Sequence, residues 1–176
     1  AAEAGLDNAE KADSQDICFV PDGDYVGFLQ RYGGVTPVPG DFVDQEGHVL
    51  GRHRGLECYT TGQRKGLGVS ADAPLYVVRK DLDAGTVVLG PDSALYTDTL
   101  TAERVNLISL SALTGPIQVT AKTRYSQKEA EATVEPLEDG RVRVTFAQPQ
   151  RAVTAGQAVV FYDGEAVVGG GTICGR

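Results

Sequence analysis

Cys18 is the side chain of this sequence with the greatest capacity for chemistry. It lies between Ile17 and Phe19, directly after a polar, acidic stretch. A thiol can act as a nucleophile or carry sulfur, but a cysteine between two bulky apolar residues is also typical of a buried strand. Nearby aspartates such as Asp13 and Asp16 disfavour the thiolate. The residues alone leave a core role and a reactive role open, and a reactive Cys18 requires a partner surface with positive charge.

The glycine-rich loop at residues 62–68 is a candidate phosphate site. Its backbone N–H groups can face an anion, and Arg64 and Lys65 add positive charge. The loop has neither the Gly-Lys-Ser/Thr of a Walker A motif nor the GxGxxG pattern that opens a helix. A plain connection between strands is the alternative interpretation.

Hydrolase and metal chemistry have little support. A Ser/His/Asp triad would have to combine Ser14 with His48 or His53, but no nucleophile-elbow sequence surrounds Ser14, which suits a turn or a helix cap. The sequence has two histidines, no CxxC and no HExxH, so we expect no self-contained zinc site.

The charge of the chain is unevenly distributed. Residues 1–46 carry ten acidic and two basic side chains, whereas residues 47–176 carry fourteen of each. A neutral segment has no general attraction for phosphate. The basic clusters at residues 52–54 and 122–128 are therefore either local anion sites or ordinary solvated surface.

Cysteine usage and apolar runs bear on the compartment. Three widely spaced cysteines do not form the framework of a secreted disulfide protein, and no apolar run approaches the ~20 residues of a membrane span. No signal peptide is visible, and the first residue is not Met. We expect a cytoplasmic protein and a piece of a longer chain.

The elements that must position these groups are mostly strands. A short helix is expected from about Tyr25, capped by Asp22 or Asp24 and ended by the glycines at 33–34. Two hairpins follow, and a second β-unit begins near Leu95. The hairpins pair residues 41–44 with 48–51 and residues 75–80 with 86–90; the candidate strands of the second unit are 117–123, 130–135, 141–147, 157–163 and 166–170. Short strands at this spacing favour a small closed barrel.

Several motifs occur in register with those of a known family. They are Asp13-Ser14-Gln15 with Ile17-Cys18-Phe19, Tyr59-Thr60 with residues 62–68, Lys122-Thr123-Arg124-Tyr125, residues 149–154 with Gly156-Gln157, and residues 160–164 with the glycine run 169–171. Together they resemble the bacterial tRNA-specific 2-thiouridylases of the MnmA family over essentially the whole chain.

The resemblance implies a mainly β fold in three parts. Residues 1–35 would be the end of the catalytic region with one helix, residues 36–92 a small β-barrel-like central domain, and residues 93–176 a six-stranded antiparallel β-barrel similar to domain 2 of translation elongation factors. The ATP-pyrophosphatase domain with which family members begin would be missing from this sequence. This part alone is then expected to be inactive.

The resemblance also implies an activity. In the family, ATP activates the C2 oxygen of the wobble uridine by adenylation, and sulfur carried on a cysteine persulfide replaces that oxygen. Cys18 would be the persulfide residue. Arg124, Tyr125 and Gln157 would contact tRNA, and these residue types suit phosphate binding, stacking and hydrogen bonding to a base or sugar.

Partners implied by the resemblance are tRNA and a sulfur-relay protein or cysteine desulfurase, with ATP bound by the missing domain and the protein a monomer. Cys58 and Cys174 depart from the family pattern, and we expect structural or incidental roles for both. The alternative function is a non-catalytic RNA- or translation-factor-binding β-barrel module in which Cys18 is a structural core residue.

Overall fold

The computed structural model describes residue 20 and residues 23–125 and 127–175. The chain divides into two compact units, Ala1–Val38 and Pro39–Arg176, which are taken separately below. Within the described ranges, no helix is long and apolar enough to span a bilayer. The expected three-part division at residues 35 and 92 stays a prediction.

Helix α1 (Tyr25–Gly33) begins and ends as the sequence predicts. The Asp24 side chain accepts a hydrogen bond from the Gly27 N–H at 2.9 Å, which satisfies one of the unpaired donors of the first turn. Gly34 ends the helix in the left-handed region, at φ 63°, where a side chain would be strained. The expected cap residue and the expected glycine stop are both confirmed.

The second unit opens with a mixed four-stranded sheet, in the order β2-β1-β4-β3. Its strands are β1 (Gly40–Val43), β2 (Val49–His53), β3 (Tyr76–Asp81) and β4 (Thr86–Gly90). The two antiparallel hairpins predicted from the sequence are present, and the parallel pairing of β1 with β4 joins them. Residues 54–75 between the hairpins contain only one short 3-10 helix, η2 (Leu56–Cys58).

His53 lies in the core of this sheet. It is 2 % exposed, and its ring packs edge-on against Phe42 and Tyr59. Nδ1 accepts a hydrogen bond from the Gly55 N–H at 3.1 Å, and Nε2 donates to the Gly85 carbonyl at 3.0 Å. These two bonds require the neutral ring protonated at Nε2. Assigning His53 to a solvated basic cluster was therefore wrong, because the period-2 alternation of β2 turns it inward while Arg52 faces outward.

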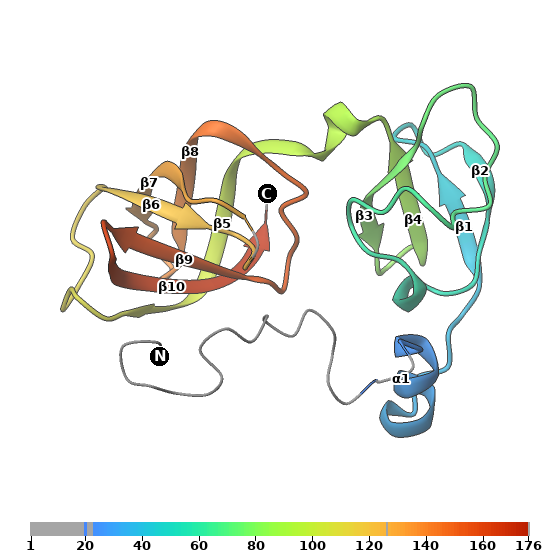
Figure 1. Cartoon of the computed structure of the whole chain (residues 1–176), viewed down its shortest axis with the longest axis horizontal. Coiled ribbons are helices and arrows are strands. Elements are labelled where there is room, and N and C mark those ends of the chain that lie inside the picture. Colours follow the sequence, from blue (N-terminus) through green and yellow to red (C-terminus); the bar gives the residue numbers. More distant parts are fainter. Residues whose placement is uncertain (1–19, 21–22, 126, 176) are drawn as a thin grey trace, which may run out of the picture. The chain divides into compact units, whose positions relative to one another are not determined.

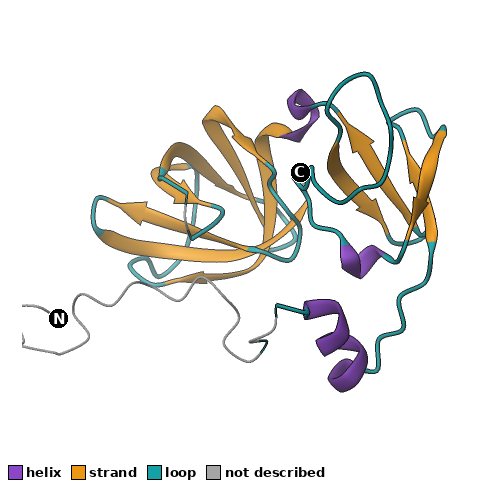
Figure 2. Ribbon diagram, turned by 45° about the vertical axis from the view of Figure 1, so that its right-hand side comes forward, coloured by secondary structure: helices purple, strands orange, loops and turns teal. Residues whose placement is uncertain are grey.

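A closed six-stranded barrel follows the sheet, in the order β10-β5-β8-β7-β6-β9 (Figures 1 and 2). Every neighbouring pair in it is antiparallel. The 3-10 helix η3 (Asp92–Leu95) leads into its strands, which are β5 (Tyr96–Leu107), β6 (Ile117–Lys122), β7 (Ala130–Pro136), β8 (Val142–Arg151), β9 (Ala158–Asp163) and β10 (Ala166–Gly175). The predicted barrel is confirmed, and its interior is filled by small and branched side chains around Phe146 and Phe161.

Strand β5 was missing from the predicted strands, although it is the longest one. Its pairing with β8 slips between Thr97 and Thr99, and its pairing with β10 slips opposite Arg104, whose φ is 51°. At Arg104 the strand has one residue more than β10, which exchanges its inward and outward faces, so a single period-2 pattern cannot be followed along it. At Thr97–Thr99 the extra residues lie on β8.

The glycine run 169–171 in β10 lies against both neighbouring strands of the barrel. A Cβ on Gly169 would lie 2.5 Å from the Asn106 carbonyl oxygen of β5, and a Cβ on Gly170 would lie 2.6 Å from the Val159 carbonyl oxygen of β9. Both neighbouring backbones approach too closely for any side chain at these positions.

Candidate functional site

A cavity of about 580 Å³ on the barrel brings three of the predicted site residues together. Arg124, Tyr125 and Gln157 all line it. They come from the end of β6 and from the turn before β9, two strands that pair directly. The other lining residues are Thr60, Lys122, Thr123, Ala158, Val160 and Tyr162. Residues separated by more than thirty positions in the sequence thus share one surface.

The barrel holds the Arg124 guanidinium in place. Its Nη2 donates to the Ala152 carbonyl at 2.6 Å and lies 3.5 Å from Thr154 Oγ1. Ala152 is buried and has a positive φ of 55°, a conformation that costs free energy in a residue with a Cβ. The Ala152 N–H is bonded to the Leu95 carbonyl at 2.8 Å, which helps to hold that conformation. The hydrogen bond between Arg124 and the Ala152 carbonyl therefore helps to fix both the guanidinium and the strained backbone conformation of Ala152.

The loop after Arg124 is tied back to the barrel through side chains. Buried Thr123 donates to the Gln127 side-chain oxygen at 2.8 Å, and Gln127 donates to Gln150 of β8. The Gln127 N–H also bonds the Arg124 carbonyl at 3.2 Å. Tyr125, in the same loop, is 80 % exposed. The loop presents a large aromatic side chain to solvent beside an anchored guanidinium.

The two cations of the cavity differ in their partners. Among the residues that the structure describes, no carboxylate forms an ion pair with Arg124, whose bonds go to uncharged oxygens. Lys122 Nζ lies 3.5 Å from a Glu129 carboxylate oxygen and 5.7 Å from the centre of the Tyr162 ring. A fixed arginine without a carboxylate partner is suited to binding an anion from outside the chain.

The remaining predicted sites are not brought to this cavity. Cys18 and Ser14 lie outside the described residues. Arg64 lines a separate cavity of about 450 Å³ formed by the segment between the two hairpins of the sheet, and Lys65 is exposed on the same loop. The Gln63 side chain closes this loop by accepting from the Thr60 N–H at 3.0 Å and donating to the Lys65 carbonyl at 2.9 Å. Cys58 is half-buried and Cys174 is exposed, and both are free thiols.

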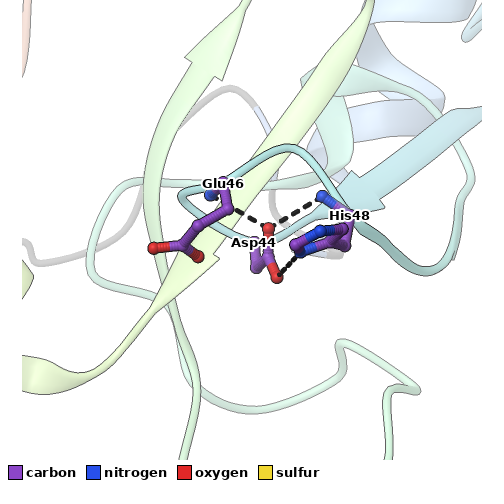
Figure 3. Close-up of side chains that lie close together, drawn as sticks. All are labelled: Asp44, Glu46 and His48. Carbon is purple, nitrogen blue, oxygen red and sulfur yellow. Dashed lines mark hydrogen bonds and ion pairs between the residues drawn. The ribbon is translucent and has the colours of Figure 1, made fainter.

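Three potential metal ligands gather in the turn between β1 and β2 (Figure 3). One ligand atom each of Asp44, Glu46 and His48 lies within 4.8 Å of the others. Both Asp44 oxygens are already used inside the turn: Oδ1 accepts from the N–H groups of Glu46 and His48, and Oδ2 bonds His48 Nδ1 at 2.9 Å. These hydrogen bonds account for the cluster as a turn-stabilising arrangement, so we assign it no metal.

The Asp44–His48 contact shifts the pKa of both side chains. The hydrogen bond to Asp44 raises the pKa of His48. Partial desolvation raises the pKa of Asp44, but the hydrogen bonds from the His48 ring and N–H outweigh it, and the net pKa is lowered. The charged form of each side chain therefore stabilises the charged form of the other.

Two family models match the chain. One, described as a tRNA methyl transferase PRC-barrel domain, matches residues 26–91, and the other, described as an aminomethyltransferase beta-barrel domain, matches residues 97–173. Curated relatives are similar over almost the whole chain. The tRNA-specific 2-thiouridylase MnmA of Acetivibrio thermocellus is 56 % identical over 173 residues, and that of Heliobacterium modesticaldum is 54 % identical over 175. The chain belongs to the MnmA family.

The alignments cover 98 % of this chain but only 48 % and 46 % of those two MnmA proteins. The chain thus spans about half the length of the curated relatives that it matches. The resemblance to MnmA predicted from the motifs is confirmed. The name of these relatives, tRNA-specific 2-thiouridylase, refers to thiolation of tRNA, whereas the two domain families are named after a tRNA methyl transferase and an aminomethyltransferase.

Sequence reasoning included Val160 and Tyr162 in the motif at residues 160–164 but assigned neither of them a role in a site. The available signal was the alternation of β9, in which buried Val159 and Phe161 point inward and their neighbours point outward. That pattern, combined with the pairing of β6 and β9, would have placed Tyr162 beside Lys122.

Proposed function

We propose that this chain is the tRNA-docking and sulfur-carrying part of a tRNA 2-thiouridylase. The observation that carries the proposal is that Arg124, Tyr125 and Gln157 line one cavity in a chain 56 % identical to an MnmA protein. An anchored arginine, an exposed tyrosine and an amide side chain supply contacts to phosphate, to a base face and to a base edge or sugar.

The chemistry of this proposal depends on Cys18 and ATP. ATP, bound outside this chain, adenylates the C2 oxygen of the wobble uridine, and pyrophosphate leaves. The terminal sulfur of a Cys18 persulfide attacks the activated carbon and AMP leaves, so that C2 is joined to Cys18 through an S–S bond. The thiolate of a second cysteine outside this chain then attacks the Cys18 sulfur, which releases 2-thiouridine and leaves a disulfide between the two cysteines, and an external thiol reduces that disulfide. A persulfide sulfur is more acidic than a thiol, so the acidic flank of Cys18 hinders it less. A sulfur-relay protein or cysteine desulfurase would reload Cys18, and we place the reaction in the cytoplasm.

Arg124→Ala in the full-length protein tests the docking role. The substitution should weaken tRNA binding about tenfold, because a charge-assisted contact to phosphate is lost. The slope of log affinity against log salt concentration should fall by about one. Fluorescence anisotropy with a tRNA transcript at several salt concentrations measures both quantities.

Arg143→Ala is the matched control. Arg143 is exposed on β8 and does not line the cavity, so its loss removes the same charge from the same barrel. Equal losses of affinity in the two variants would show that tRNA responds to net charge, and would contradict a specific site at Arg124.

A further inference from the structure

The outer face of the β6–β9 pair forms the rest of the cavity around Arg124. Lys122 pairs with Val160 and Thr120 pairs with Tyr162 in the antiparallel register. Because Val159 and Phe161 are fully buried, Ala158, Val160 and Tyr162 face outward and line the cavity. Lys122 and Arg124, two positions apart with buried Thr123 between them, lie on the same side.

Lys122 is held in an ordered position. Its ammonium is 3.5 Å from Glu129 and lies over the Tyr162 ring at 5.7 Å. Glu129 is itself fixed by the Thr120 hydroxyl, which donates to its second oxygen at 2.8 Å. An ordered lysine loses less conformational entropy when it binds an anion than a mobile one does. The cavity therefore has two positioned cations along one wall.

The rest of the lining is apolar or aromatic. Ala158 and Val160 provide aliphatic surface, and Tyr125 and Tyr162 add two aromatic side chains. The volume of about 580 Å³ is within the range of roughly 300–1,000 Å³ found for sites that enclose small ligands. A site that contacts only the backbone of a duplex needs cations, but it does not need an apolar and aromatic lining.

We propose that this cavity binds one unstacked nucleotide of the tRNA, with its base against Tyr162 and Val160 and its phosphate between Lys122 and Arg124. The inference rests on the proposed function and adds to it a base-binding subsite on the barrel. Single-stranded RNA is recognised through aromatic stacking combined with cations along the backbone.

The test uses full-length protein and a tRNA transcript. Tyr162→Ala should weaken binding about tenfold, because stacking of one base is lost. Tyr162→Phe, which keeps the ring, should bind within about twofold of wild type, whereas Tyr162→Leu should behave like Tyr162→Ala. Tyr96→Ala, at an exposed tyrosine outside the cavity, is the control and should leave binding unchanged. Thermal unfolding of each variant checks its fold, and the Phe and Leu variants carry the test if the Ala variant does not fold.

A second readout locates the nucleotide. Transcripts containing 5-bromouridine at single unpaired positions are irradiated with the protein, and the crosslinked peptide is identified by mass spectrometry. One position should crosslink to the peptide that contains Tyr162, and Lys122→Met should reduce that crosslink.

The outcomes separate the two proposals. If the Phe and Leu variants bind alike, or if Tyr162→Ala binds as wild type while Arg124→Ala is weakened, the base subsite is wrong and the docking role stands. If Arg124→Ala also binds as wild type, the proposed tRNA-docking role is itself wrong.

Discussion

At the scale of single residues, the two histidines have opposite roles. His53 is buried and neutral, with both ring nitrogens bonded to backbone groups, whereas the His48 side chain is 78 % exposed and pairs with Asp44. Sequence alone placed both in the same class of candidates, because the residue type does not reveal whether the side chain is buried in a strand, as at His53, or exposed in a turn, as at His48.

His53→Ala should destabilise the sheet by ~3 kcal/mol, since it leaves a cavity and removes the partners of a buried N–H and a buried carbonyl. Urea unfolding of the wild type and the variant measures the difference. His48→Ala, measured at about pH 8.5, is the matched control and should change stability by less than about 0.5 kcal/mol. A His53→Ala variant as stable as this control would show that the buried contacts add little.

The Asp44–His48 pair should make a pH-dependent contribution to stability. The pKa of His48 is raised from 6.5, so its contribution is complete below that value and is lost as the pH rises through the raised pKa. The pKa of Asp44 is lowered from 3.8, so its contribution is present above that value and is lost as the pH falls through the lowered pKa. The pair thus stabilises the fold in the window between 3.8 and 6.5.

His48→Gln tests this window. The melting temperature of the variant should lie below that of the wild type at about pH 5.5, and the two should converge at about pH 8.5. The effect is small, because both groups face solvent and salt screens them. A difference that is constant with pH would mean that the ring contributes through packing or hydrogen bonding without its charge.

At the scale of elements, the β10 glycine run explains how the barrel closes between β5 and β9. Gly170→Ala should destabilise the fold by on the order of 2–4 kcal/mol, because its Cβ would meet a backbone oxygen that cannot move alone. Gly175→Ala in the same strand is the control: its Cβ would lie 3.8 Å from the nearest atom, an ordinary contact. Thermal unfolding compares them, and equal melting temperatures would contradict a steric role for the run.

The sequence predicted elements best where their patterns are local. Helix α1 and the two hairpins of the sheet followed from capping residues, glycines and alternation, and all three are present. Strand β5 did not follow, since its register slips are set by pairing with β8 and β10, which lie far from it in the sequence. The candidate site shows the same limit: Arg124 was predicted, but the Ala152 carbonyl that holds it comes from a strained turn with no local signal.

At the scale of the whole molecule, charge is separated along the chain. The net charge of −8 belongs to residues 1–46, and the remainder is neutral. A neutral barrel attracts a polyanion weakly over its whole surface, so binding of tRNA would depend on locally placed cations such as Arg124 and Lys122. This accounts for our expectation that single substitutions in the cavity have large effects on affinity.

Formation of 2-thiouridine in tRNA by the full-length protein tests the central claim most directly. Wild type is compared with Cys18→Ser, Cys58→Ser and Cys174→Ser, with a persulfide donor and ATP, and nucleosides are quantified by mass spectrometry. Our account predicts that Cys18→Ser forms no 2-thiouridine while it still binds tRNA, and that the other two variants retain activity. Normal thiolation by Cys18→Ser would contradict the account and leave Cys18 as a structural residue of an RNA-binding barrel protein.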